Sequence, residues 1–261
     1  MSKAKTTVRE LTLEEKIQRA LDIQEVQNVM SKHAYYHGLG LNFEELENIW
    51  TKKAPNASFA MNVGYWVGYD SIYNAYGTIH LANQKADLAR LLVNYPSVAE
   101  DALGAGTLIM HCLTTPIIEI AGDGQTAKAM WYTPGQVTGI GSDGYPSAQW
   151  MWEKYGVDFI NEEGEWKIWH MQICTDCSCD VAGNTSWVTS ATTSAAAPAL
   201  VLKDAETATI NPTPDISVTT YNSYSNTQVP QNFPKMPEPY WTFSETFSYG
   251  AEWLLEKEAL D

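Results

Sequence analysis

The sequence has few arginines, and none of them lies beyond residue 90. Its 261 residues include 16 lysines and arginines against 31 aspartates and glutamates, so the formal net charge is −15. The arginines are Arg9, Arg19 and Arg90. Affinity for nucleic acid and for anionic membrane surfaces comes largely from Lys and Arg. This balance therefore argues against both as partners, and favours a small, weakly charged substrate.

Long apolar runs and numerous cysteines are also missing. The first residues, MSKAKTTVREL, lack the apolar segment of a secretory signal, and no run approaches the length of a membrane span. We therefore expect a cytoplasmic protein, in which Cys174, Cys177 and Cys179 are free thiols. The alternative is a metal site completed by Cys112 or His170, because the cluster supplies only three thiolates. No glycine-rich segment has the context of a nucleotide-binding loop, so we expect neither metal nor cofactor.

Hydrophobic periodicity separates a helical first part from a strand-rich middle. The first helix is expected to begin with a capping box formed by Thr12 and Glu15. The expected elements are helices at 12–37, 42–50, 70–76 and 78–93, a strand pair within 57–69, and four β-rich runs between 107 and 175. This order predicts an α+β fold, in which a curved antiparallel sheet covered by the N-terminal helices would enclose a pocket.

The composition changes again near residue 184. Seven of the twelve prolines follow residue 180, and residues 171–261 contain three lysines against eleven acids. We expect one folded domain at 1–183 and, at 184–261, a Ser/Thr/Ala linker followed by an extended arm. The arm is rich in Tyr, Trp and Phe, so it must pack on its own domain or on a neighbouring subunit.

Histidine is the side chain best suited to proton transfer at neutral pH, and the sequence has five. His111 lies in the first β-rich run on a face shared with apolar side chains, and His170 lies in the last run. His37 and Tyr36 end the first helix. We expect His111 to be the principal acid or base, His170 or His37 to be its partner, and Tyr36 to donate a hydrogen bond to a substrate oxygen. A buried structural histidine is the alternative for each one taken singly.

The 30 aromatic residues, ten of them tryptophan, suit a pocket for an aromatic or polycyclic ligand. The side chains expected to bind substrate are Trp66, Trp131, Trp150, Lys154 and Tyr155. Lys154 would pair with a phenolate or an oxyanion. Strand alternation places Trp150 and Lys154 on one face and Tyr155 on the other. Core or interface packing is the alternative for each tryptophan.

Several segments between residues 22 and 173 resemble the nuclear transport factor 2-like superfamily, in its SnoaL-like branch. The most specific are MHCLTTPIIEIAGDGQTAKAMWY and WEKYGVDFINEEGEWKIWHMQI. The resemblance implies a cone-shaped α+β barrel with a deep pocket. The superfamily includes scytalone dehydratase, bile-acid 7α-dehydratase, ketosteroid isomerase, polyketide cyclases, and lyases that remove formaldehyde from lignin-derived diarylpropanes. Because its members usually pair through the outer face of the sheet, we expect a homo-oligomer, a dimer or trimer formed through the sheet and the arm.

The resemblance also implies roles for individual residues. In the dehydratases, a helix Tyr, an Asp about one turn later and a strand His form the acid–base set. His111 matches the strand His, and Tyr35 or Tyr36 resembles the helix Tyr. The Asp has no counterpart here, because the stretch HGLGLN offers only His37 and Asn42. We predict a cofactor-independent lyase that eliminates water or formaldehyde from a bulky hydroxylated aromatic or polycyclic substrate. The alternatives are an isomerase or cyclase, or a non-catalytic protein that binds a hydrophobic ligand.

Overall fold

The computed structural model describes residues 10–182, 186–188 and 210–252. The helical elements are α1 (Leu13–Leu39), α2 (Asn42–Ile49), α3 (Tyr69–Ile72), a π-helical turn η1 (Tyr73–Thr78), α4 (Ile79–Asn94) and one 3-10 turn, η3 (Phe243–Glu245). The strands are β1 (Ser58–Met61), β2 (Gly64–Val67), β3 (Leu108–His111), β4 (Thr114–Ile120), β5 (Thr126–Ile140), β6 (Pro146–Glu162), β7 (Glu165–Asp180) and β8 (Ile216–Ser217). None of the helices in these ranges has the length and apolar character needed to cross a membrane.

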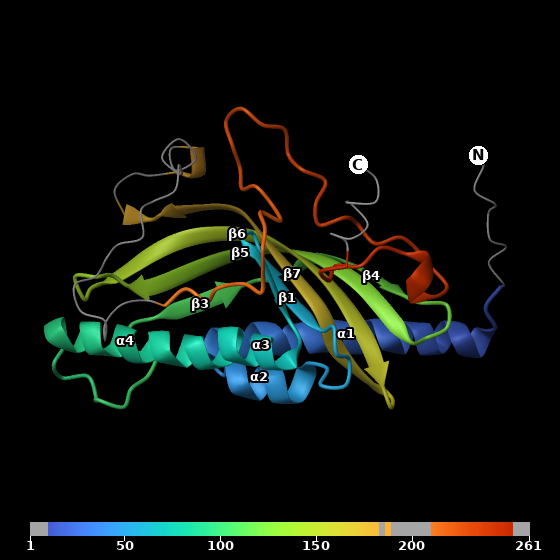
Figure 1. Ribbon diagram of the computed structural model, residues 1–261, viewed down its shortest axis with the longest axis horizontal. Coiled ribbons are helices and arrows are strands. Elements are labelled where there is room, and N and C mark those ends of the chain that lie inside the picture. The colour runs from blue at the N-terminus through green and yellow to red at the C-terminus, as the bar shows by residue number, and fades with distance from the viewer. Residues whose placement is uncertain (1–9, 183–185, 189–209, 253–261) are drawn as a thin grey trace.

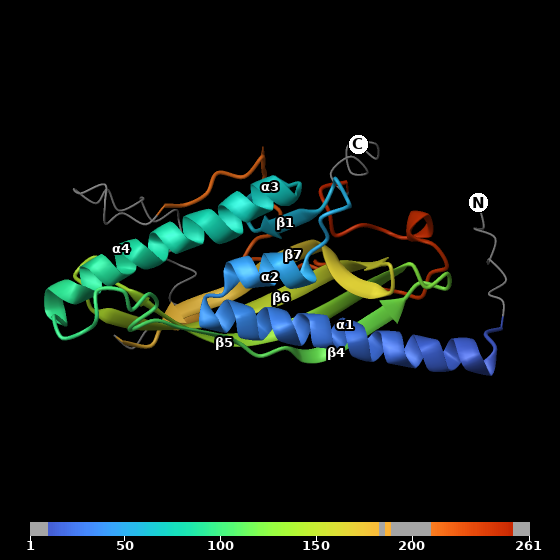
Figure 2. The same cartoon turned by 90° about the horizontal axis from the view of Figure 1, so that it is seen from below.

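The strands form one curved, open sheet, and the helices lie against one of its faces (Figures 1 and 2). The strand order is β3-β5-β6-β7-β1-β2-β8, and β4 pairs with the remaining part of β5. Long antiparallel ladders join β5 to β6 and β6 to β7, while β1 runs parallel to β7. The predicted α+β fold is therefore confirmed, with one parallel pair that the expected antiparallel sheet did not include.

Helix α1 begins as predicted, because Thr12 and Glu15 form both hydrogen bonds of a capping box. Its buried side chains include Val26, Met30 and His33, at spacings of three and four residues that place them on one helical face. This face packs on the concave side of the sheet, where fully buried residues such as Trp131 and Phe159 complete the core. The apolar stripe of α1 therefore ends at a histidine that lies inside the molecule.

A β-bulge in β7 reverses the alternation of its side chains. Ile168 pairs with Phe159, but the next paired residue of β7 is His170, opposite Asp158, so Trp169 is the extra residue. Ile168 and Met171 both belong to the core, and the bulge between them turns His170 to the opposite face. Simple alternation from Ile168 would have turned His170 toward the helices.

The C-terminal arm covers part of the outer face of the sheet, opposite the helices (Figure 1). Phe243, Phe247 and Tyr249 surround the ammonium group of Lys128, whose Nζ lies 4.4, 4.6 and 5.1 Å from their ring centroids. Gly156 makes room for the arm, because a Cβ there would lie 2.6 Å from the Tyr249 ring. The described part of the arm thus packs on its own domain. A homo-oligomer formed through the sheet and the arm stays a prediction.

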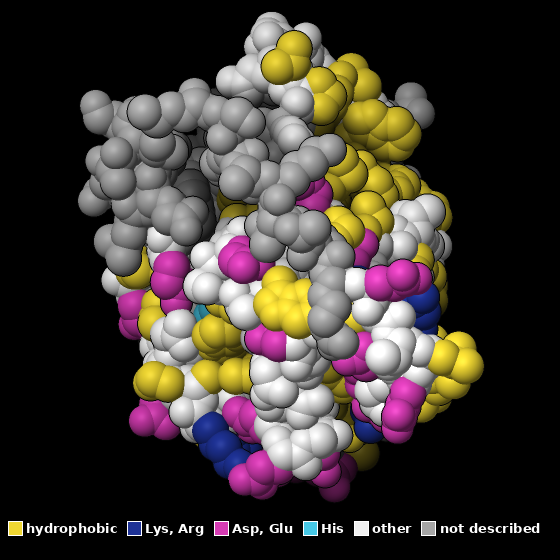
Figure 3. All heavy atoms as spheres, turned by 90° about the vertical axis from the view of Figure 1, so that its right-hand side faces the viewer, with side chains coloured by type: hydrophobic (Ala, Val, Ile, Leu, Met, Phe, Trp, Pro, Cys, Tyr) yellow, Lys and Arg dark blue, Asp and Glu magenta, His cyan; other side chains and the backbone are white. Residues whose placement is uncertain are grey.

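The end of the molecule drawn in Figure 3 reflects the charge balance of the sequence, because acidic side chains are spread over it and basic ones are sparse. Several acids nevertheless have basic partners, such as Arg19 with Glu119 and Lys167 with Glu165. Such exposed pairs each contribute little to stability.

Candidate active site

A cavity of about 320 Å³ lies between the helices and the concave face of the sheet. Four of the five histidines line it, together with two tyrosines and one glutamate: His33, His37, His80, His111, Tyr76, Tyr155 and Glu153. Apolar side chains from β1, β2, β3, β5, β6 and β7 line the rest. The cavity therefore combines a cluster of proton-transfer groups with an apolar region, as ligand sites commonly do.

Two of these histidines come from the last turns of α1. His33 and His37 are four residues apart, so they lie on the same helix face, and their rings stack with centroids 5.7 Å apart. The helix ends at Gly40, whose φ of 69° is the left-handed conformation typical of a helix terminus. The position of this terminus leaves both imidazoles at the cavity rather than in solvent.

Glu45, on α2, is the buried acceptor at the centre of the cluster. It is fully buried, and its Oε1 accepts hydrogen bonds from His33 Nδ1 at 2.8 Å and Trp50 Nε1 at 3.0 Å. Its Oε2 accepts one from the Tyr76 hydroxyl at 2.9 Å. The sequence comparison with dehydratases found no carboxylate in the loop after α1. In the structure, a carboxylate reaches His33 and Tyr76 from the next helix.

Tyr76 is delivered by the π-helical turn between α3 and α4. The segment Tyr73–Thr78 continues α3 directly into α4 but with a wider turn. Such turns occur frequently at functional sites because they redirect a side chain from a helix. The Tyr76 backbone carbonyl also accepts a hydrogen bond from Asn42 Nδ2 at 2.7 Å, which ties the turn to α2. Sequence periodicity treated this region as ordinary helix, so it did not mark Tyr76.

The hydrogen bonds of Tyr76 define the tautomer of His37. The hydroxyl has one proton, which it donates to Glu45, yet its oxygen also lies 3.0 Å from His37 Nδ1. His37 Nδ1 must then carry a proton and donate it to the hydroxyl oxygen. A neutral His37 in this arrangement has its lone pair on Nε2, where it is available as a base.

His111 enters the cavity from β3, which packs against the C-terminal end of α1. Its ring centroid lies 5.8 Å from that of His37 and 6.4 Å from that of Tyr155. Within the described residues, its Nδ1 is buried and has no hydrogen-bond partner, and the nearest carboxylate oxygen, Glu153 Oε2, is 3.4 Å away. Gly135 faces it on β5, and a Cβ there would lie 2.8 Å from Nδ1. The fold therefore makes room for a ring whose buried Nδ1 has no hydrogen-bond partner among the described residues.

Burial sets the protonation states of these groups. It lowers the pKa of His111 to about 4 and the pKa of His37 well below its usual value, with neighbouring histidines adding to both effects. A backbone hydrogen bond at Thr133 opposes the shift of the His111 pKa. Burial raises the pKa values of Tyr76 and Tyr155 well above 10, and nearby carboxylates raise them further. At neutral pH the imidazoles are therefore bases and the phenols are hydrogen-bond donors.

Glu153 lies on β6 and lines the cavity together with the histidines. Its Oε1 accepts a hydrogen bond from Thr175 Oγ1 at 3.0 Å, and burial raises its pKa. A β-bulge in the β6–β7 pairing occurs next to it. In the sequence, Glu153 alternates with Trp150, Trp152 and Lys154. This strand alternation was the one indication that Glu153 shares a face with Tyr155.

The structure brings together only some of the residues selected from the sequence. His37, His111, Trp66 and Tyr155 line the cavity. Tyr36 does not: it is half-buried against the core, and its hydroxyl accepts a hydrogen bond from Asn48 Nδ2 at 3.3 Å. The sequence analysis did not select His33, Tyr76, His80 or Glu153. Of these four residues, the two histidines had been noted only as members of the set of five.

Three residues predicted to bind substrate lie elsewhere. Trp131 is fully buried in the core, where its Nε1 donates to Gln27 Oε1 at 3.1 Å. Trp150 is on the outer face and stacks on Trp152 with ring centroids 5.9 Å apart. Lys154 is also on that face, where its Nζ contacts Tyr221 and Asp176 at 3.0 and 3.1 Å. Both are at even-numbered positions of β6, and strand alternation turns these side chains to the face opposite Tyr155 and the cavity.

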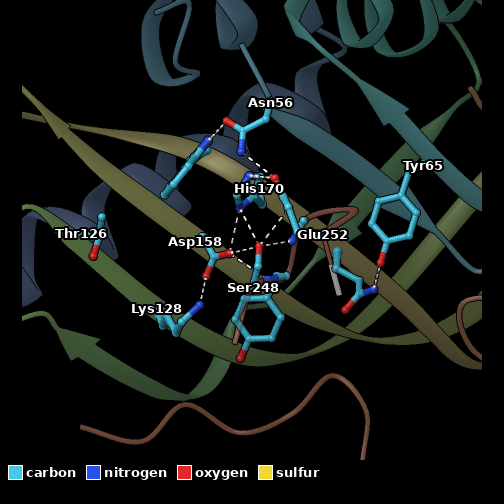
Figure 4. A network of polar contacts seen from close by, with 12 residues as sticks. Asn56, Tyr65, Thr126, Lys128, Asp158, His170, Ser248 and Glu252 are labelled. Carbon is cyan, nitrogen blue, oxygen red and sulfur yellow. Dashed lines mark hydrogen bonds and ion pairs between the residues drawn. The ribbon is translucent and has the colours of Figure 1, made fainter. Parts of the chain in front are cut away.

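His170 lies beneath the arm, on the face of the sheet opposite the cavity (Figure 4). Its Nδ1 is 2.9 Å from Asp158 Oδ2 and 3.3 Å from Ser248 Oγ, and Asp158 Oδ1 accepts from Lys128 Nζ at 2.6 Å. These contacts join β5, β6, β7 and the arm. The bulge at Trp169 therefore gives His170 a place in the arm interface, and the structure does not bring it together with His37 and His111.

The cysteines are free thiols on the sheet. Cys112 is exposed, Cys174 and Cys179 are buried, and Cys177 is half-buried. Burial raises the pKa of Cys177 to about 11. Among the residues that the structure describes, no group of three or more His, Cys, Asp or Glu side chains is arranged to hold a metal ion.

Comparisons with known proteins agree with this architecture. The model of the SnoaL-like domain family matches residues 18–172. A search of curated proteins found no match. Among solved structures, the chain is similar to LinA, with 12% identity, a TM-score of 0.47, and coverage of 66% of this chain and 97% of LinA.

Two further solved structures have a similar relation to the chain. The first is hexachlorocyclohexane dehydrochlorinase LinA-type3 from Novosphingobium barchaimii LL02, with 13% identity, a TM-score of 0.44, and coverage of 66% of this chain and 97% of that one. The second is a nuclear transport factor 2-like superfamily protein from Salmonella enterica serovar Typhimurium LT2, with 15% identity, a TM-score of 0.41, and coverage of 64% and 95%. Because the family model spans more than half of the sequence, the protein belongs to the SnoaL-like domain family.

Proposed function

We propose that the protein is an acid–base lyase that eliminates water or formaldehyde from a hydroxylated aromatic substrate bound in this cavity. The observation that carries the proposal is His111, whose side chain is 6% exposed and whose Nδ1 lacks a hydrogen-bond partner among the described residues. A buried polar atom without a partner is costly unless a ligand or water satisfies it. Its low pKa keeps this nitrogen a base at neutral pH.

In a dehydration, the His111 Nδ1 lone pair takes the proton from a substrate carbon. The electron pair of that C–H bond forms a C=C bond, and the adjacent C–O bond breaks. The proton is then returned to the leaving hydroxide, which departs as water. The Glu153 carboxylate, 3.4 Å from Nδ1, stabilises the imidazolium formed between these two steps. The imidazole thus makes both proton transfers, and the carboxylate stabilises the charge between them.

Loss of formaldehyde begins with a hydroxyl proton and uses His37 as the base. His37 Nε2 takes the proton of a primary hydroxyl, and the C–C bond to that carbon breaks as formaldehyde leaves. The electron pair again forms a C=C bond while a second hydroxyl departs as water, with a proton from the imidazolium. Tyr76 and Tyr155, which keep their protons at neutral pH, are the donors for the substrate oxygens.

The proposal is tested with a panel of hydroxylated aromatic compounds, including 1,2-diarylpropane-1,3-diols, whose products are identified by mass. Loss of water or of formaldehyde supports a lyase, and a product of unchanged mass indicates an isomerase. His111→Gln should lower turnover by about 10²–10⁴-fold, the usual contribution of general acid–base catalysis. His170→Gln is the matched control, because it makes the same change on the opposite face. Equal turnover in the two variants would refute the role of His111.

A further inference from the structure

The described chain resumes at Ile210 beside the cavity, far in sequence from the domain that forms the rest of its wall. Ile210, Asn211 and Pro212 all line the cavity. We refer to residues 210–217 as the strap. It runs alongside α4 and α3 in both views before the chain crosses to the outer face (Figures 1 and 2). A segment of the C-terminal arm is therefore part of the candidate active site.

Side chains of α4 and β2 hold the first half of the strap. The Asn83 amide makes two hydrogen bonds with the backbone of Ile210, donating to its carbonyl at 3.0 Å and accepting from its N–H at 2.7 Å. Trp66, which also lines the cavity, donates from Nε1 to the Thr213 carbonyl at 3.0 Å. The two residues that fix the strap thus contact the cavity as well.

The second half of the strap is fixed to β2 and α3. The Asp215 carboxylate accepts hydrogen bonds from the Val67 N–H at 2.8 Å and from Ser71 Oγ at 2.6 Å. Ile216 and Ser217 then pair with β2 as strand β8. These contacts hold the strap at the edge of the cavity through its backbone and its short side chains.

Gly64 shows how closely the strap approaches β2. Its φ is +146°, and a Cβ there would lie 2.8 Å from the Pro214 Cβ and would overlap the Ile216 carbonyl oxygen. A side chain at this position must therefore push the strap away. Gly124 has a φ of +71°, but a Cβ there would have no heavy atom of the described residues within 4 Å. The two glycines separate the effect of displacing the strap from the effect of backbone strain.

We propose that the strap is the substrate-selecting wall of the active site, with Ile210 and Pro212 packing on the apolar part of the ligand. The proposal rests on the cavity being the substrate site of the proposed function. A volume of about 320 Å³ is at the lower end of the range for small-molecule pockets. The ligand class that fits it is an uncharged, hydroxylated compound of about two aromatic rings, with the strap burying its apolar rim.

The test measures binding of 2-naphthol, a neutral bicyclic phenol, to the full-length chain by calorimetry. The wild type and Gly124→Ala should bind it with Kd values within about twofold of each other. In Gly64→Ala the displaced strap no longer covers the ligand, so Kd should rise at least about tenfold. Equal weakening in both glycine variants, or no binding to the wild type, would overturn the proposal.

A second variant keeps the test valid if Gly64→Ala does not fold. Asp215→Ala removes the hydrogen bonds to Val67 and Ser71 from an exposed position of the strap itself, and should weaken 2-naphthol binding in the same direction. Diethylpyrocarbonate should also modify His111 faster in this variant than in the wild type. Unchanged binding and labelling would overturn the proposal. Neither measurement needs turnover, so an inactive His111 variant bears on the lyase and leaves the strap result unaffected.

Discussion

Replacing Glu45 with Gln should strongly lower turnover in the loss of formaldehyde, the reaction that uses His37 as its base, while leaving the fold intact, because it reverses a tautomer rather than removing a contact. The amide oxygen can still accept from His33 Nδ1 and Trp50 Nε1, which both use Oε1. The amide NH₂ then occupies the Oε2 position and donates to Tyr76. The Tyr76 proton must turn to His37 Nδ1, 3.0 Å away, and the proton of neutral His37 moves to Nε2. The lone pair that faced the substrate is lost.

The size of each effect follows from the hydrogen bonds. Three bonds to a carboxylate become bonds to a neutral amide, and each loses about 1 kcal/mol, so stability should fall by about 3 kcal/mol at most. Glu45→Ala instead leaves three buried donors without an acceptor, at about 1–3 kcal/mol each, and should unfold or nearly unfold the domain. A reversed tautomer lowers turnover by about 10²–10⁴-fold. This loss of turnover corresponds to about 3–5 kcal/mol in the activation free energy, and it should be seen in a protein that is still folded.

Two measurements check this reasoning. Nitrogen-15 chemical shifts of the histidine rings report the tautomer of His37, and thermal or urea unfolding reports stability. Glu44→Gln is the matched control, since Glu44 lies on the same helix but is exposed. A Glu45→Gln variant with wild-type turnover, or with the His37 proton still on Nδ1, would refute the relay through Tyr76.

Three further predictions concern other parts of the molecule. The pKa of His111 is about 4, below its unfolded value. Stopped assays should therefore show turnover that is level from about pH 5 to 8 and falls about tenfold per pH unit below about 4. Urea unfolding should show a free energy of unfolding that decreases as pH falls from about 6.5 to 4. Gly135→Ala should displace the His111 ring and lower turnover, while Gly139→Ala on the same strand, where a Cβ has no described atom within 4 Å, should not; equal activities would contradict the packing argument. Lys128→Met leaves a buried carboxylate without its lysine partner and should lower the free energy of unfolding in urea by about 3–5 kcal/mol. Lys52→Met, at an exposed pair, should lower it by less than about 1 kcal/mol.

Local patterns predicted the elements of this fold well. The capping box at Thr12, the β-rich runs between 107 and 175 and the switch from helical to alternating periodicity are all encoded by neighbouring residues. The π-helical turn that presents Tyr76 is not, because one extra residue in a helical turn leaves the hydrophobic pattern nearly unchanged. Glu45 fell within the helix expected at 42–50 but was not selected as a site residue. Its spacing from Leu46 and Ile49 places it on the buried face of α2, which was the available signal.

The two strand histidines show why site residues are harder to predict than strands. His111 and His170 occupy comparable positions in apolar strands, and each is within two residues of a core or cavity side chain. The face of the sheet to which a side chain points depends on the count of residues along the strand. A single bulge therefore reverses that face without altering composition or length. The extra residue at Trp169 places His170 beside Asp158 and under the arm, whereas β3 pairs with β5 without a bulge and leaves His111 in the cavity. The same side chain is therefore a structural link on one strand and a candidate base on the other, and only the register of the sheet distinguishes them.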